Sequence, residues 1–213
     1  MPFDSGDYRD KESNGAGGTY CANSSYGCNA WAATANLVGS PSEFTNTTQT
    51  GTVLLDSSLN EYLNGEYLDS ITVNKDKIVN HDFSIGAVKN NNTDLATQIL
   101  GENSYKWNGE VGLISVSDYI NANSNQELCG TFSKNQSSYS TCKNTNWMYK
   151  SENDWWTLSP NATDTGVVWT IHGNGLFYNY YSRPSYGVRP AVFLDSSFNF
   201  SGSGTQSDPF VIN

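Results

Sequence analysis

The sequence predicts an α+β fold in which short antiparallel strands, two short helices and long loops form a single domain over residues 1–213. Three observations predict it. Short apolar runs recur between turns rich in Asn, Gly and Ser, which is typical of short strands. Helical spacing of apolar residues is confined to two segments. The 13 Tyr, 9 Phe and 6 Trp residues supply far more apolar surface than disordered chains carry, so we expect a folded core.

The two helices are predicted from periodicity and capping residues. In the first, apolar residues recur at positions i, i+4, i+7 and i+8 behind the potential N-cap Asp56, and Gly65 is the expected end. These apolar residues are Leu55, Leu59, Tyr62 and Leu63. The second helix is expected to begin at Ser117, whose side chain would cap it.

Strands are predicted where β-branched and aromatic residues run between turns. In the first half of the chain they are expected at residues 78–79, 83–88 and 95–100, and at 105–116 with a turn at Asn108-Gly109. In the C-terminal third they are expected at residues 154–160, 166–171, 175–181 and 186–194. Residues 1–28 are polar and Gly-rich and are predicted to form an N-terminal extension with a frayed start.

A formal net charge of −10 narrows the range of partners. Nucleic-acid phosphates and anionic lipid headgroups would be repelled over most of the surface, so neither is an expected partner. The sequence has no run of 18 apolar residues, and its first twenty residues lack the apolar middle of a secretory signal. We therefore expect no direct membrane insertion by this segment, and we expect any export signal or anchor to have been removed.

The four cysteines form two close pairs in the sequence, Cys21 with Cys28 and Cys129 with Cys142. Two local disulfide loops are the favoured interpretation, because neither pair has the CxxC spacing of a zinc site and the two histidines lie near no cysteine. Zinc ligation and free thiols are the alternatives. Disulfides would place the protein in an extracellular location or on a cell or virion surface.

Several motifs resemble one family. The order Trp155-Trp156-x-Leu-Ser-Pro, a variable stretch and Gly187-Val-Arg-Pro-Ala-Val is similar to the C-terminal core of C-type-lectin-fold domains of the formylglycine-generating-enzyme-like type. The ending Gly202-Ser-Gly-Thr-Gln-Ser-Asp-Pro-Phe-Val-Ile strengthens the likeness. Gly112-Leu-Ile-Ser-Val-Ser-Asp-Tyr-Ile and Tyr20-Cys-x6-Cys-Asn-Ala-Trp look like ectodomains of bacterial pilin-like surface proteins. The resemblance covers roughly half of the chain and implies a C-type lectin fold.

Such domains include the variable proteins of diversity-generating retroelements and pilus-tip adhesins, in which a fixed scaffold displays a hypervariable binding surface. The resemblance implies that this variable, ligand-binding region lies at about residues 155–190. The ligand contacts expected there are Asn161, Thr163, Asp164, His172, Asn174, Phe177, Tyr178, Asn179, Tyr180, Tyr181 and Ser182.

The residue types in this region also point to binding. Tyr gives a large rigid contact area at small entropic cost, and Asn both donates and accepts hydrogen bonds. A two-faced ribbon over residues 172–182 cannot bury all four of its aromatic rings, so some are expected to be exposed. Ordinary core tyrosines are the alternative interpretation.

Three residues of the same region are expected to be structural. Trp155 and Trp156 are adjacent on a strand and therefore point to opposite faces, so one can fill the core while the other covers a second layer or faces solvent. Arg189 lies in an apolar run, where an uncompensated charge would cost several kcal/mol. We expect it to pair with a carboxylate or with several carbonyl groups.

Catalysis is not expected. The formylglycine-generating relatives need reactive cysteines in the C-terminal core, and this chain has no cysteine after Cys142. A catalytic set built on His81 or His172 lacks a Gly-x-Ser-x-Gly elbow. Oxygen ligands such as Asp195 and Asp208 have no regular spacing, and the Glu-Pro-Asn or Gln-Pro-Asp triplet of calcium-dependent lectins is absent. No cofactor or metal is therefore predicted, with calcium left open.

The expected function is extracellular ligand binding by an adhesin or receptor-binding protein, whose ligand is a protein or glycan on a cell or virus surface. The alternative is a structural pilin-like filament or tip subunit without a specific ligand, attached to a pilus through a missing N-terminal segment. An enzyme of the formylglycine-generating type is the third interpretation.

Overall fold

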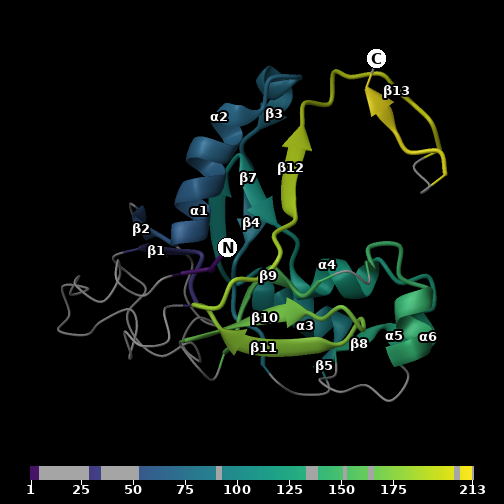
Figure 1. The fold of residues 1–213 in the computed structure, drawn as a ribbon. Coiled ribbons are helices and arrows are strands. Elements are labelled where there is room, and N and C mark those ends of the chain that lie inside the picture. The colour runs from purple at the N-terminus through teal and green to yellow at the C-terminus, as the bar shows by residue number, and fades with distance from the viewer. Residues whose placement is uncertain are drawn as a thin grey trace.

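The computed structural model describes residues 1–4, 29–34, 53–89, 93–132, 139–150, 153–162, 166–203 and 207–212. Over these residues the fold is α+β, with short antiparallel strands in small sheets and several short helices (Figure 1). The predicted α+β class is therefore confirmed. The prediction of only two helices is wrong, because residues 95–102 and parts of the segment between residues 121 and 146 are helical as well.

The first helix is longer than expected. It runs without interruption from α1 (Ser58–Tyr62) through a π-helical stretch, η2 (Leu63–Tyr67), to α2 (Leu68–Ser70), and so passes Gly65. The buried stripe of Leu59, Leu63 and Leu68 continues across the glycine. Its burial outweighs the roughly 1 kcal/mol that a glycine costs inside a helix.

Ser57, and not Asp56, caps this helix. The Ser57 Oγ accepts a hydrogen bond from the Asn60 backbone N–H at 3.2 Å. Asp56 is the last residue of strand β2 (Val53–Asp56), which pairs with β1 (Ala32–Thr34). The strand therefore extends one residue into the segment where we expected the helix to start.

Residues 95–100, expected as a strand, belong to helix α3 (Leu95–Glu102). This helix reverses the usual polarity, because Gln98 and Glu102 are buried whereas Leu100 is 72% exposed. Residues four apart lie on the same helix face, so the buried face of α3 is polar. The strand prediction failed because it assumed that the apolar residues face the core.

The stretch 105–116 forms two strands with different partners and no hairpin at Asn108-Gly109. The first, β6 (Lys106–Gly109), pairs with β4 (His81–Ser84). The second, β7 (Val111–Leu113), pairs with β12 (Pro190–Leu194). The strand predicted at 83–88 is likewise shorter, because β4 ends at Ser84.

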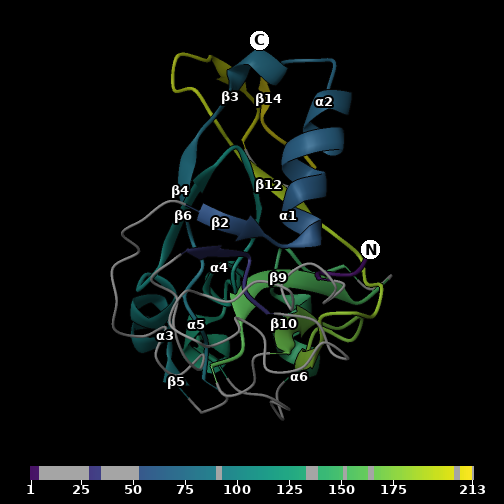
Figure 2. The same ribbon diagram turned by 90° about the vertical axis from the view of Figure 1, so that its left-hand side faces the viewer.

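Strand β12 lies between two neighbours, β7 on one side and β3 (Ile78–Val79) on the other. In Figure 2 the helix α1–α2 runs along one side of β12, and strands β4 and β6 lie on the other side. A short 3₁₀ turn, η3 (Lys75–Lys77), leads into β3. β12 is thus the strand that joins the C-terminal third of the chain to the first half.

Helix α4 (Val116–Asn121) begins after Ser115 and not at Ser117. The Ser115 Oγ accepts a hydrogen bond from the Asp118 N–H at 3.1 Å, and the Asp118 carboxylate accepts one from the Ser115 N–H at 2.8 Å. This reciprocal pair is a capping box. Ser117 therefore lies inside the first turn, where its hydroxyl is free to bond elsewhere.

The C-terminal third contains the sheet that was predicted there. Strands β9 (Trp155–Pro160), β10 (Val167–Ile171) and β11 (Phe177–Tyr181) are antiparallel in the order β11-β10-β9, in the lower half of Figure 1. Trp156 packs in one apolar cluster with Trp31 and Phe83, and Trp155 packs in a second with Trp169 and Phe177. Both tryptophans are buried, because each face of β9 has its own core.

The first residues of the chain belong to the first of these cores. Phe3 is fully buried, and its ring lies 5.9 Å from those of both Trp31 and Trp156. The Phe3 N–H donates to the Ser182 carbonyl at 2.8 Å, and the Trp156 Nε1 donates to the Met1 carbonyl at 3.0 Å. The expected frayed start is therefore wrong for residues 1–4.

The segment between residues 121 and 146 contains α5 (Gln126–Cys129), β8 (Thr131–Phe132) and α6 (Tyr139–Asn144). Strand β8 pairs with β5 (Thr93–Asp94). The predicted disulfide between Cys129 and Cys142 is present. The predicted pair Cys21 and Cys28 lies outside the described residues.

The C-terminal residues form a separate two-stranded hairpin, β13 (Phe200–Ser201) with β14 (Val211–Ile212), which extends beyond the end of β12 in Figure 1. Within the residues that the structure describes, no helix has the length and apolar character needed to cross a bilayer.

Candidate functional site

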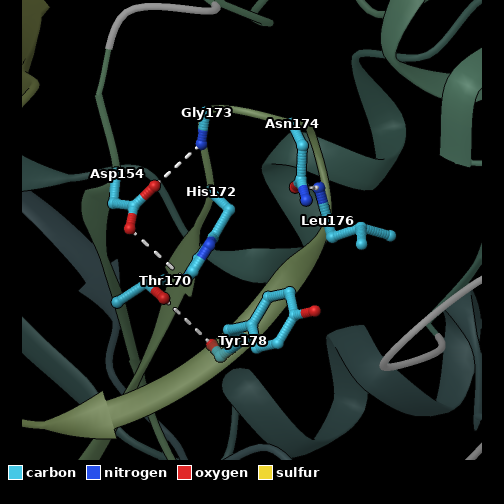
Figure 3. Close-up of polar contacts among 7 residues, drawn as sticks. All are labelled: Asp154, Thr170, His172, Gly173, Asn174, Leu176 and Tyr178. Atoms are coloured by element: carbon cyan, nitrogen blue, oxygen red, sulfur yellow. Dashed lines mark hydrogen bonds and ion pairs between the residues drawn. The ribbon is translucent and has the colours of Figure 1, made fainter.

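The hairpin of β10 and β11 carries most of the predicted contact residues. Its turn is closed by hydrogen bonds from the His172 N–H to the Leu176 carbonyl at 2.9 Å and from the Gly175 N–H to the His172 carbonyl at 2.7 Å. Gly175 has a φ of +85°, a conformation that other residues rarely adopt. The Asn174 Oδ1 accepts from the Leu176 N–H at 3.0 Å, so this predicted contact residue also shapes the turn (Figure 3).

Strand alternation divides the predicted contact residues between two faces of the hairpin. Tyr178 pairs with Thr170 and Tyr180 with Val168, on the face that packs toward the first core. Asn179 and Tyr181 lie on the opposite face, with Tyr181 43% exposed. Successive residues of a strand point to opposite faces, so one flat ligand surface cannot use all of them.

A cluster of one carboxylate and four rings lies on the first face and continues beyond it. We call it the His172 cluster, and it consists of Asp154, His172, Tyr178, Tyr180 and Tyr186. The His172 ring lies 4.2 Å from that of Tyr178 and stacks on that of Tyr180 at 5.4 Å. Tyr180 in turn meets Tyr186 edge to face at 5.3 Å. These tyrosines are half-buried, so their rings are held in place while part of each faces solvent.

Asp154 anchors the cluster to the turn. One carboxylate oxygen accepts a hydrogen bond from the Gly173 N–H at 2.9 Å, and the other lies 3.4 Å from the His172 Nε2 (Figure 3). The His172 Nε2 and the Asp154 carboxylate are within ion-pair distance, but their geometry does not form a hydrogen bond. The tyrosines next to it, Tyr178 and Tyr180, belong to the same strand, so the hairpin holds the pair against the rings.

The electrostatics of the cluster favour a neutral histidine. Burial lowers the pKa of His172, and the Asp154 carboxylate opposes that shift. Burial also raises the pKa of Tyr186, and the nearby Tyr180 and Asp154 add to the shift. The cluster is therefore a surface of neutral rings next to one carboxylate.

Three further predicted contact residues do not join this surface. The side chains of Asn161, Phe177 and Ser182 are buried, with at most 6% of each exposed. These three side chains lie beneath the surface of the sheet, so they add no exposed group to the cluster. Thr163 and Asp164 lie outside the described residues.

Arg189 is compensated by a carbonyl group and a ring. Its Nη1 donates to the Met148 carbonyl at 2.5 Å, and its guanidinium lies 4.3 Å from the centre of the Trp155 ring. A guanidinium stacked on an aromatic face is stabilised by the ring quadrupole. The contact ties residues 187–190 to the β9 strand next to the His172 cluster.

The structure also shows a pocket that the sequence reasoning missed. It has a volume of about 390 Å³ and lies between β4, the end of α3, the start of α4 and β12. We call it the Glu102 pocket. Its lining residues are His81, Asp82, Phe83, Ser84, Ile99, Glu102, Asn103, Lys106, Leu113, Ile114, Ser115, Ser117, Asp118, Asn121, Leu158, Ala191, Val192 and Phe193.

Glu102 lies at the inner side of this pocket and is only 1% exposed. Its carboxyl group accepts hydrogen bonds from the Ser159 hydroxyl at 2.6 Å, from the Ser117 N–H at 3.3 Å and from the Ser117 hydroxyl. Burial raises the pKa of Glu102, while these hydrogen bonds oppose the shift. A buried carboxyl group with a perturbed pKa in a pocket is a feature of functional sites.

The sequence carried weak signals for these missed residues. Asp154 and Tyr186 flank the two motifs of the family resemblance and were not singled out. Glu102 follows an apolar stretch that looks like a strand, so its burial could not be read from the pattern. Among the described residues, no group of three or more His, Cys, Asp or Glu side chains is placed to hold a metal ion.

Comparison with known families assigns the chain to one of them. A family model described as a domain of unknown function, DUF6273, matches residues 37–196, about three quarters of the chain.

The chain belongs to the DUF6273 family. The matched range includes the β9–β11 sheet, the His172 cluster and the whole Glu102 pocket, and it ends before the β13–β14 hairpin. No curated protein and no solved structure matches the chain.

Proposed function

We propose that this DUF6273 protein is an extracellular adhesin or receptor-binding module, in which a scaffold of the C-type lectin kind presents the His172 cluster to a protein or glycan ligand on another surface. The observation that carries the proposal is the cluster itself. Four aromatic rings and a carboxylate are fixed by ring contacts and backbone hydrogen bonds, yet remain partly open to solvent.

Preorganised aromatic side chains are effective binding groups. Rings that are already held in place lose little conformational freedom on binding, so more of their contact energy appears as affinity. Tyr178 and Tyr180 are held by the His172 ring, and Tyr186 is held by Tyr180 and by the buried Trp156 at 4.8 Å. The surface therefore does not have to order itself when a ligand arrives.

The disulfide and the composition support an extracellular location. A disulfide closes the segment between Cys129 and Cys142, and such bonds persist in oxidising compartments. The low charged fraction of 15% leaves solubility to Asn, Ser, Thr and Gly, which suits a secreted surface. The proposal assigns binding and no catalytic step to the cluster.

The test is a binding screen with a matched pair of variants. The wild-type protein, Tyr178→Ala and Tyr62→Ala are applied to an array of glycans and to an array of cell-surface ectodomains. Tyr62 is 36% exposed on the α1 helix and makes none of the ring contacts of the cluster, so its variant controls for the loss of any surface tyrosine. Tyr180 is left intact because it packs against the first core.

Signals seen with the wild type and with Tyr62→Ala should fall about 30-fold in affinity or more with Tyr178→Ala, which is the usual size of a hot-spot loss. Unchanged circular dichroism would show that the variant is folded. Ligands that bind Tyr178→Ala as well as they bind the wild type would contradict the proposal, as would the absence of any ligand on both arrays.

A further inference from the structure

The Glu102 pocket shares no lining residue with the His172 cluster, so the proposed adhesive function does not account for it. It is enclosed by elements from four parts of the chain, and its lining mixes aromatic rings with carboxylates. From its charges and rings we propose that this pocket binds a small organic ammonium ion. The inference is independent of the proposed function.

The charges of the pocket favour a cation. Three carboxyl groups line it, those of Asp82, Glu102 and Asp118, against one lysine, Lys106. The Lys106 ammonium is already held by the Ser84 Oγ at 2.6 Å and by the Asn103 Oδ1. A pocket with low-dielectric walls and an excess of one charge concentrates ligands of the opposite charge.

Two of the carboxylates keep an oxygen available. Asp82 accepts from the Asn108 Nδ2 through Oδ1 at 2.7 Å, and Asp118 accepts from the Ser115 N–H through Oδ2 at 2.8 Å. The second oxygen of each carboxylate is not engaged by these bonds, and both side chains are exposed. An ammonium group supplies the donors that these oxygens lack.

The apolar part of the lining suits the organic portion of such a ligand. Phe193 is 43% exposed at the end of β12 that pairs with β3, and its ring stacks on His81 at 3.4 Å. Phe83 meets Phe193 edge to face at 5.5 Å. A cation near exposed aromatic rings is attracted by their quadrupoles, and the attraction grows as water is excluded.

The spacing of the acidic groups argues for an organic ion over a metal ion. In the described part of the chain, no three acidic, histidine or cysteine side chains approach one another closely enough to ligate a metal, so these carboxylates surround a space and do not meet at a point. That space is about 390 Å³, enough for an alkylammonium ion of several carbon atoms.

The experiment is a titration followed by ¹H–¹⁵N NMR spectra. The probes are n-butylammonium, choline and the neutral isostere n-butanol, each added to about 10 mM, where even a weak site is occupied. Peaks of residues 99–106, 113–121 and 191–193 should shift with the two cations. The tripeptide Gly-Lys-Gly, with blocked ends, tests whether a lysine side chain of a partner supplies the same group as a free amine does.

Two variants make the test specific. Asp82→Asn with Asp118→Asn removes both available carboxylates, while an Asn side chain can still accept the Ser115 hydrogen bond. Glu66→Gln, at an exposed position on η2, removes one negative charge from a residue that does not line the pocket. The double variant should bind n-butylammonium about tenfold more weakly or worse, and Glu66→Gln should bind as the wild type does.

Several results would overturn the inference. One is n-butanol shifting the same peaks at the same concentrations as n-butylammonium. Another is unchanged affinity in the folded double variant, judged by an otherwise superimposable spectrum. A third is the absence of any shift at the pocket with all of the cations. Loss of array binding by Tyr178→Ala would leave this outcome untouched, so the two proposals fail separately.

Discussion

Removing the disulfide between Cys129 and Cys142 should destabilise the protein chiefly through its unfolded state. The two cysteines are 13 residues apart, and closing a loop of this length removes chain entropy worth about 3 kcal/mol in the unfolded ensemble. For a chain of this size, such a change corresponds to a fall in the melting temperature of about 6–12 °C. The perturbation is the double substitution Cys129→Ala and Cys142→Ala.

The native segment should survive this change because other bonds hold it. The Asn123 Nδ2 donates to the Cys142 carbonyl at 2.6 Å, and the Asn146 Nδ2 donates to the Tyr119 carbonyl at 2.6 Å. The Gln126 Nε2 donates to the Asn123 carbonyl at 2.6 Å. These buried or half-buried hydrogen bonds fix both ends of the loop without the sulfur atoms. The ¹H–¹⁵N NMR spectrum of the folded variant should therefore differ from that of the wild type only near residues 126–145.

Urea unfolding in non-reducing buffer measures the full effect, and the same experiment in reductant separates its causes. Both cysteines are buried, at 4% and 8% exposure, so the alanines also lose some packing. In reducing buffer the wild type has no disulfide, so the stability difference between it and the double variant contains only the packing loss. In non-reducing buffer the difference also contains the entropic contribution of the closed loop. A loss below about 1 kcal/mol in non-reducing buffer, or an equal loss in both buffers, would refute the loop-entropy reasoning.

Three further predictions test other parts of the fold. Burial raises the pKa of Glu102 above its unfolded value of 4.5. The free energy of unfolding should therefore fall as pH rises from 4.5 to the raised folded pKa, by up to about 1.4 kcal/mol per pH unit. Glu102→Gln should remove that slope in urea unfolding between pH 4 and 8, and a parallel slope in both proteins would contradict the prediction. Arg189→Lys keeps the charge but loses the planar stack on the tryptophan ring, and should lower the unfolding free energy by about 1–2 kcal/mol. Gly112→Ala places a methyl group 2.5 Å from the Phe83 ring and should lower the unfolding free energy by about 1–3 kcal/mol. At Gly65 an added methyl group meets no atom within 4 Å, so Gly65→Ala should raise the unfolding free energy by up to about 1 kcal/mol. Equal melting temperatures of the two variants would contradict both predictions.

The sequence predicts this fold best where apolar residues face the core. Strands β9, β10 and β11 lie where they were expected, because their β-branched and aromatic runs are bounded by Gly and Pro turns, and β9 and β10 are also buried on both faces. The first helix was found from its leucine spacing, although its ends were not. Capping and termination depend on single hydrogen bonds, such as the one to Ser57, that several neighbouring residues can offer.

The candidate site is only partly readable from the sequence. An Asn- and Tyr-rich hairpin near the C-terminus indicates a surface rich in binding groups, and six of the predicted contact residues lie there with side chains exposed or half-buried. Which of them share a face depends on the strand register, which pairs Tyr178 with Thr170 and Tyr180 with Val168. The partners Asp154 and Tyr186 come from other segments, so only the tertiary structure brings them to the cluster.

The two clearest failures of the sequence reasoning occur at one place. Helix α3 buries Glu102 and exposes Leu100, and strand β12 exposes Val192 and Phe193 although its sequence reads as a core strand. Glu102, Val192 and Phe193 line the same pocket. A foldable sequence agrees with its structure at most positions, and the exceptions concentrate where function opposes stability. Burying a carboxyl group and exposing a phenylalanine both cost free energy, and neither is needed to complete the two cores. A bound organic cation would offset both costs, because it supplies a counter-charge to the acidic lining and covers the exposed ring.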